Sequence, residues 1–91
     1  MMTREAKEKL IEKFKTHSKD TGSPQVQIAI LSAEIKELSE HLAMHKKDFS
    51  SRRGLLRKVS ERRRLEKYLG REDAEAFEKL MEKLKSHKLV A

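Results

Sequence analysis

A regular apolar spacing dominates the segment that follows Ser23-Pro24. Large apolar side chains recur there at intervals of three and four residues, at Ile28, Leu31, Ile35, Leu38 and Leu42. This spacing is typical of a helix that packs one side against other helices. A serine that can cap a helix, followed by a proline that fits its first position, marks the start. The sequence therefore predicts a long amphipathic helix from Pro24 to about Met44.

Three more segments show helical spacing. They are expected from Arg4 to about Lys15, from Phe49 to about Leu69, and after Asp73. Polar residues suited to N-caps precede all four helices, at Thr3, Ser23, Asp48 and Asp73. The polar stretch 16–23 is expected to be a loop, and residues 86–91 a frayed tail. The prediction is one all-α domain over residues 1–91, with four helices, of which three pack as an antiparallel bundle and the N-terminal one is mobile.

The composition excludes several classes of protein. The chain has 91 residues, with three glycines, one proline and no cysteine, which argues against an all-β fold, disulfides and thiolate metal sites. Its longest purely apolar run is only Ile28 to Leu31, too short for a membrane span or a signal-peptide core. Only 36% of residues are hydrophobic, so a deep catalytic cleft is not expected. We therefore expect no enzyme activity, no cofactor and no small-molecule substrate.

The positive charge is concentrated in one short segment. The net charge of the chain is +7, and residues 52–64 alone carry seven bases and one acid. Six of these bases are arginines, whose planar guanidinium matches phosphate; the seven are Arg52, Arg53, Arg57, Lys58, Arg62, Arg63 and Arg64. Such a block is either a solvated helix face or a surface for a polyanion, and the arginines favour nucleic acid.

Helical geometry sorts the third segment into two faces. At about 100° per residue, one face carries Arg53, Arg57, Arg64, Tyr68 and Arg71 within roughly 60° of one another. The opposite side carries apolar residues that can pack inward: Leu55, Val59, Leu65 and Leu69. A tyrosine at a core edge is the ordinary interpretation of Tyr68. Its position among arginines equally favours contact with a sugar, base or phosphate.

The second helix has a polar line beside its apolar seam. Gln27, Glu34 and His41 are seven residues apart, and His45 continues the line. Such positions are most often the polar flank of a buried helix. The two histidines could hold a metal, but no third ligand is in place and neighbouring lysines repel cations, so no metal is expected. Asp48 with Ser51 is equally well explained by an N-cap bond.

The spacing of these residues resembles the bacterial ribosomal protein S-fifteen family, the fifteenth protein of the small subunit. The matching pattern covers nearly the whole chain. It runs through Asp20-Thr21-Gly22-Ser23, Val26-Gln27, Leu38, His41-Leu42, His45-Lys46-Lys47-Asp48, Ser51-Arg52-Arg53-Gly54-Leu55-Leu56, Arg62-Arg63-Arg64, Leu65 and Tyr68.

The resemblance implies a fold, a ligand and a set of contacts. Proteins of this kind have a three-helix bundle with the first helix lying apart, and they are primary binders of 16S ribosomal RNA in the cytoplasm. They grip a three-way junction, nucleate assembly of the platform and join a bridge to large-subunit ribosomal RNA, beside neighbouring small-subunit proteins. By resemblance, the junction is held by Thr21, Gly22, Gln27, Arg64, Tyr68 and Arg71. A second RNA site, in a shallow minor groove, is contacted by His41, His45, Asp48 and Ser51.

Helical geometry is compatible with such a two-site surface. In an antiparallel hairpin of the second and third helices, Gln27 lies near Tyr68 at one end. His41 lies near Asp48 and Ser51 at the other end, about 20 Å away. A guanine in the minor groove offers an N2 donor that a carboxylate can accept, which explains an aspartate within a basic protein.

The chain departs from the family pattern in three places. Phe49 and Ser50 stand where relatives often have two histidines, and the C-terminus lacks the usual glycine and arginines. Glu34, midway along the hairpin, would repel a phosphate. The alternative function is a protein–protein module built on the apolar seam, although the unbalanced arginines of the third helix disfavour a coiled coil. An enzyme is a distant third interpretation.

Overall fold

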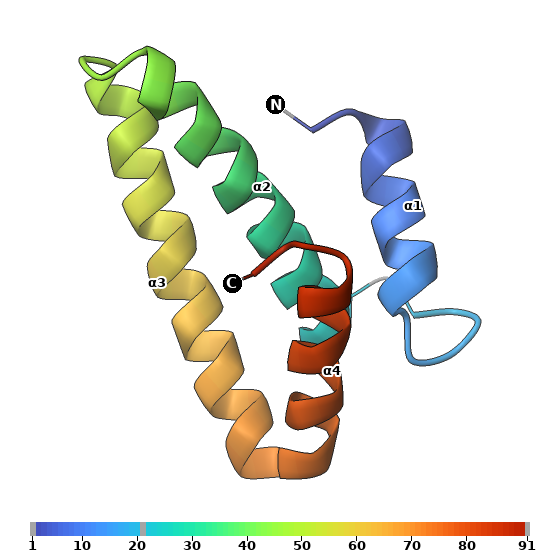
Figure 1. The fold of residues 1–91 in the computed structure, drawn as a ribbon. Helices are drawn as coiled ribbons and strands as arrows, with labels where there is room; N and C mark the ends of the chain where they lie inside the picture. The colour runs from blue at the N-terminus through green and yellow to red at the C-terminus, as the bar shows by residue number, and fades with distance from the viewer. Residues whose placement is uncertain (1, 21, 91) are drawn as a thin grey trace.

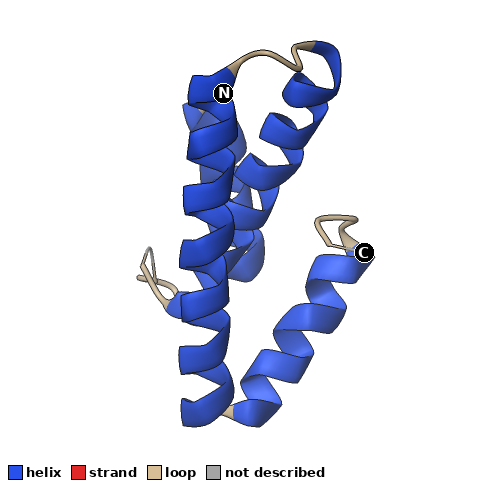
Figure 2. Ribbon diagram, turned by 90° about the vertical axis from the view of Figure 1, so that its left-hand side faces the viewer, coloured by secondary structure: helices blue, strands red, loops and turns tan. Residues whose placement is uncertain are grey.

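The computed structural model describes residues 2–20 and 22–90. Within these residues the fold consists of helices and contains no strand (Figure 2). The helices are α1 (Arg4–Phe14), α2 (Pro24–Met44), α3 (Phe49–Glu72) and α4 (Ala74–Ser86). The predicted all-α, four-helix architecture is therefore confirmed.

The two long helices form an antiparallel hairpin (Figure 1). A short turn over residues 45–48 joins α2 to α3 at one end of this hairpin. At the other end α4 turns back from α3 toward the middle of the molecule, and α1 lies beside α2. The hairpin is thus covered by other helices only in the half that is distant from the turn at residues 45–48.

Side-chain caps start all four helices at the predicted residues. Backbone N–H groups donate to the Thr3, Ser23, Asp48 and Asp73 side chains, each three residues before the donor. These bonds satisfy one of the free N–H groups that every helix start leaves unpaired. The caps fix where each helix begins, and they therefore fix the length of every connection.

The core lies where all four helices meet. It is formed by the buried residues Phe14, Val26, Ile28, Ala29, Leu69, Leu80 and Leu84. Along α2, the predicted seam residues Ile28, Leu31 and Leu38 are buried, while Ile35 and Leu42 are half-buried. Leu38 is the buried residue closest to the turn at 45–48, so the hairpin becomes a two-helix structure beyond it.

The first helix docks on α2 mainly through its last residue. Phe14 is buried in the core, whereas Leu10 and Ile11 pack against it and remain half-buried. Lys83 of α4 lies 4.9 Å from the centre of the Phe14 ring and donates to the carbonyl of Lys13. Mobility of α1 in the free protein stays a prediction that hydrogen exchange can test.

Two boundaries differ from the sequence-based expectation. The third helix continues past Leu69 to Glu72, and Asp73 serves both as its C-cap and as the N-cap of α4. The expectation of a frayed tail is wrong for residues 86–90. Leu89 N–H donates to the Leu84 carbonyl and Lys88 N–H to that of Lys85, which is the Schellman pattern of helix ends. The tail therefore folds back, and Leu89 packs on the core.

Candidate nucleic-acid interface

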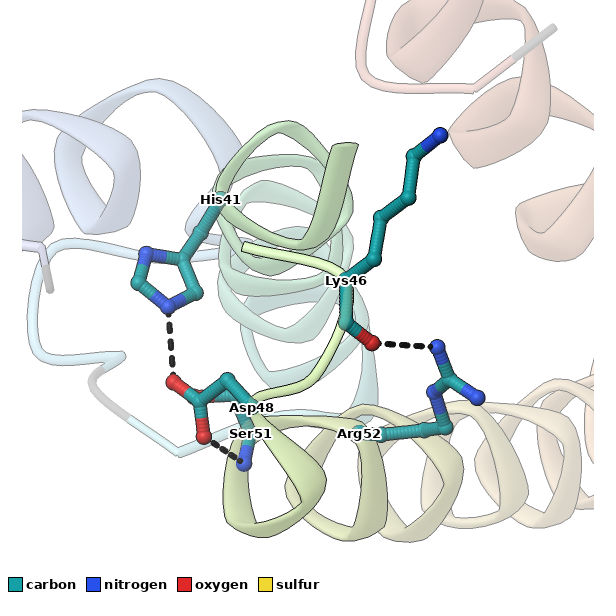
Figure 3. Close-up of polar contacts among 5 residues, drawn as sticks. All are labelled: His41, Lys46, Asp48, Ser51 and Arg52. Atoms are coloured by element: carbon teal, nitrogen blue, oxygen red, sulfur yellow. Dashed lines mark hydrogen bonds and ion pairs between the residues drawn. The ribbon is translucent and has the colours of Figure 1, made fainter. Parts of the chain in front are cut away.

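One polar cluster closes the hairpin at the turn between α2 and α3 (Figure 3). His41, one turn before the end of α2, donates from Nε2 to Asp48 Oδ2 at 2.8 Å. Ser51, in the first turn of α3, donates to Asp48 through its backbone N–H at 3.1 Å and its hydroxyl at 2.7 Å. The structure therefore brings together the three residues that the sequence placed at this end. It also shows that Asp48 is both an N-cap and a bridge between the helices.

The Asp48 carboxylate is held in its charged form. Hydrogen bonding from Ser51, followed by that from His41, lowers its pKa well below the usual range of an aspartate. A carboxylate has about four acceptor positions, and the three bonds described leave one of them free. The side chain is 34% exposed, so this remaining position is accessible to a donor from outside.

His45 extends this cluster along α2. Its ring lies 4.6 Å from that of His41, with 30° between the ring planes. Within the described residues, no group of three or more His, Cys, Asp or Glu side chains could hold a metal ion. The two exposed histidine rings therefore lie against each other beside the Asp48 carboxylate.

The turn itself is held by a second interaction. Arg52 donates from Nη2 to the Lys46 carbonyl at 2.8 Å, as Figure 3 shows, and lies 6.0 Å from the ring centre of Phe49. Phe49 is 61% exposed. The turn therefore presents an aromatic ring and three bases to solvent around the partly exposed carboxylate of Asp48.

A second polar cluster lies in a hollow between α1, α2 and α3. Gln27 and Arg64 line this hollow together with Gly22, and Ile11 and Leu65 form its apolar wall. The Gln27 side-chain amide donates to the Gly22 carbonyl at 2.6 Å. Three of the predicted junction residues are thus brought together, one from the α1–α2 loop, one from α2 and one from α3.

Two other predicted junction residues, Tyr68 and Arg71, are not among those that line this hollow. Tyr68 is 47% exposed and lies one turn beyond Arg64 on α3, outside the hollow's lining. Arg71 is exposed near the end of the same helix. Thr21 lies outside the described residues. The two clusters are separated by the length of α2 between Gln27 and His41, about 21 Å at 1.5 Å per residue.

Not all of the basic block faces outward. Arg53, Arg57 and Arg64 are exposed, as predicted. Lys58 instead pairs with Glu34 of α2 at 3.2 Å, with about a quarter of each side chain exposed. Arg62 donates to Ser32 at 3.4 Å and lies 3.4 Å from Glu66. The idea of one continuous polyanion-binding stripe is therefore corrected, since these two bases link α3 to α2.

Asp20 was missed as a candidate. It lies in the α1–α2 loop and is only 4% exposed, yet it is charged and accepts several hydrogen bonds from that loop. The signal available in the sequence was an aspartate two residues before a glycine and three before a serine cap. Asp side chains commonly accept from backbone N–H groups at those two spacings.

Membrane insertion through a helix finds no support in the described residues, because none of their helices has the length and hydropathy to cross a bilayer.

Comparison with known proteins gives one consistent match. A family model described as "Ribosomal protein S15" matches residues 7–87. The chain is 55% identical over 83 residues to the small ribosomal subunit protein uS15 of Carboxydothermus hydrogenoformans, covering 91% of this chain and 93% of the relative. It is 51% identical to the protein of that name from Dictyoglomus thermophilum and 52% to the one from Halalkalibacterium halodurans, with the same coverage.

Proposed function

Because the chain belongs to the ribosomal protein S15 family, we propose that it works in the small subunit of the cytoplasmic ribosome as a primary binder of 16S ribosomal RNA. Family membership makes it a structural RNA-binding protein and not an enzyme. The observation that carries the finer proposal is the pair of polar clusters held about 21 Å apart on one hairpin. A rigid body of this form can hold two RNA segments at a fixed distance.

The cluster at Gly22, Gln27 and Arg64 would grip a three-way junction. Besides the carboxylates of Glu34 and Glu61, its lining combines a backbone carbonyl, an amide and a guanidinium, which suit sugars, bases and phosphates respectively. Tyr68 and Arg71 extend this surface along α3, and the half-exposed ring of Tyr68 suits stacking on an unpaired base. The apolar wall of the hollow supports the choice of a junction, where bases are splayed out of their helices.

The cluster at His41, Asp48 and Ser51 would contact the shallow minor groove of an RNA helix. That groove exposes 2′-hydroxyls and base edges, and a guanine there presents its N2 donor. Asp48 has one free acceptor position and is charged, so it suits this donor. His41 and His45 add ring nitrogens beside it. A surface that bound phosphate alone would gain nothing from a central carboxylate.

Further roles follow from holding two RNA segments together. Fixing a junction early would nucleate assembly of the platform and prepare sites for neighbouring small-subunit proteins. The turn at residues 45–48 is the exposed end of the hairpin and carries Phe49, Lys46 and Lys47. This end would contribute to a bridge with large-subunit ribosomal RNA.

The test maps both ends on RNA. Since the chain has no cysteine, Lys47→Cys and Lys67→Cys can each carry a tethered iron chelate that cleaves nearby RNA. Both positions are exposed, one at the turn and one beside Tyr68. On 16S ribosomal RNA, the Lys67→Cys chelate should cleave around a three-way junction and the Lys47→Cys chelate along one of its helices. Cleavage by both chelates at the same nucleotides, or at none, would contradict the two-site proposal.

A further inference from the structure

The α1–α2 loop is built around one carboxylate. Asp20 is the only charged residue that is buried within the described part of the chain. Its Oδ2 accepts from the Thr16 backbone N–H and hydroxyl, both at 2.8 Å. Its Oδ1 accepts from the backbone N–H groups of Gly22 at 3.2 Å and Ser23 at 2.8 Å. Four donors from both sides of the loop therefore converge on one side chain.

These bonds require an ionised carboxylate. Hydrogen bonding from Ser23, and further bonds from Thr16, lower the pKa of Asp20 well below the usual range, against the opposing effect of burial. An amide of the same shape would point its NH₂ group at two of the four donors. Asparagine can therefore fill the space but cannot satisfy the loop.

The carboxylate connects two elements that carry the RNA surface. Thr16 follows the end of α1, and Ser23 is the N-cap of α2. Gly22 lies between them, and its carbonyl accepts from Gln27 in the hollow that Arg64 also lines. The position of the Gly22 carbonyl therefore depends on the bond that the Gly22 N–H, one peptide away, donates to Asp20.

We propose that Asp20 is a positioning residue, which holds the Gly22–Gln27 corner in the geometry that binds RNA and does not contact the RNA itself. This proposal rests on the proposed function, since it concerns the junction end of the same surface. The proposal predicts different effects at the two ends of the hairpin, because Asp20 does not touch the residues of the cluster at Asp48. Loss of Asp20 should therefore impair one RNA contact and leave the other in place.

The chain contains a matched control for this residue. Asp73 is also an aspartate that caps a helix, but it is exposed and its side chain accepts from Ala76 N–H at 3.1 Å. Asp73→Asn makes the same chemical change far from the hollow. Asparagine is as good an N-cap as aspartate, so this variant should keep its fold.

The experiment compares Asp20→Asn with Asp73→Asn in the full chain. Urea unfolding gives the folded fraction of each, and titration with a transcript of the central domain of 16S ribosomal RNA gives the affinity. The folded Asp20→Asn protein should bind this RNA about tenfold more weakly, because asparagine cannot accept all the charge-assisted hydrogen bonds that hold the loop. In the Asp20→Asn background, RNA cleavage by the chelate at Lys67→Cys should become weaker or less localised, while cleavage by the chelate at Lys47→Cys should be unchanged. Asp73→Asn should leave both cleavage patterns and the affinity unchanged.

Two outcomes would overturn the proposal. One is unchanged affinity and cleavage in folded Asp20→Asn, and the other is a parallel loss at both ends that follows only the folded fraction. Thr16→Val keeps the carboxylate and removes one donor, so it tests the idea even where Asp20→Asn fails to fold. It should weaken binding about two- to threefold at the junction end alone. If the proposed function itself is wrong, the chelate at Lys67→Cys should fail to cleave the junction even when Asp20 is unchanged.

Discussion

Two arginines of α3 that are two residues apart should behave differently when RNA binding is measured against salt. Arg64 is exposed at the edge of the hollow. Arg62 has 22% of its side chain exposed and is turned toward Ser32 and Glu66. Arg64→Gln and Arg62→Gln remove the same charge from the same helix. Only Arg64→Gln should remove a charge that contacts a phosphate of the RNA.

The structure sets the size of the effect. Six arginines of α3 are exposed and available to phosphate: Arg52, Arg53, Arg57, Arg63, Arg64 and Arg71. Each neutralised phosphate contributes about −0.9 to the slope of log affinity against log salt, so five or six contacts give a slope of about −4.5 to −5.5. Arg64→Gln should flatten the slope by about one unit. Arg62→Gln should leave it unchanged and lower the free energy of unfolding by about 1 kcal/mol, through loss of its internal hydrogen bonds.

Filter binding or fluorescence anisotropy between about 50 and 200 mM salt covers the range in which such slopes are linear. Urea unfolding of both variants supplies the folded fraction, so that a stability loss is not mistaken for a binding loss. Equal slopes for the two variants would refute the assignment of Arg62 to the interior and Arg64 to the RNA surface. A slope near zero for the parent chain would refute phosphate contact altogether.

Three further outcomes are expected. Asp48→Asn can keep the N-cap bond from the Ser51 N–H but loses the charge and the bonds that Oδ2 accepts from His41 and the Ser51 hydroxyl, so RNA binding should weaken about tenfold and the free energy of unfolding should fall by about 1 kcal/mol; unchanged RNA binding with a lower urea midpoint would make Asp48 only a cap. Lys88 has a φ of 59°, where glycine is favoured, so Lys88→Gly should raise the free energy of unfolding by about 0.5–1 kcal/mol. A lower midpoint of thermal unfolding in this variant would contradict the helix-end geometry. Amides of residues 5–15 should exchange faster than those of 28–42 in the free chain and slow when RNA binds, whereas equal protection without RNA would exclude a mobile α1.

Local signals made most of the fold predictable. All four caps are short side chains that accept from a backbone N–H three residues later, so sequence alone locates them. The apolar spacing along α2 places Ile28 and Leu38 on the buried side of the helix. The contact between His41 and Asp48 also follows, since the turn that joins α2 to α3 is short enough to bring them together.

Features that depend on tertiary contact could not be predicted in this way. Helical spacing already places Lys58 on the leucine side of α3 and Arg57 on the other side, but the pairing of Lys58 with Glu34 depends on how α2 packs against α3. The fold of the tail depends on a lysine, Lys88, taking a backbone conformation that a sequence rule assigns to glycine. Asp20 resembles any loop aspartate until its four donors are seen together.

Different interactions stabilise the two ends of the hairpin. Around Gly22 the surface is supported by the core, since α1 and α4 pack there and Asp20 ties the loop to the end of α1 and the start of α2. Beyond Leu38 no side chain of α2 is fully buried, and hydrogen bonds among His41, Asp48 and Ser51 join α2 to α3 beside the half-buried Leu42. The atoms that close the hairpin at this end are therefore the same atoms that would meet the minor groove. A substitution there changes shape and chemistry together, whereas Arg64 can be changed without disturbing the fold, and this is why the matched arginine pair gives the cleaner test of RNA binding.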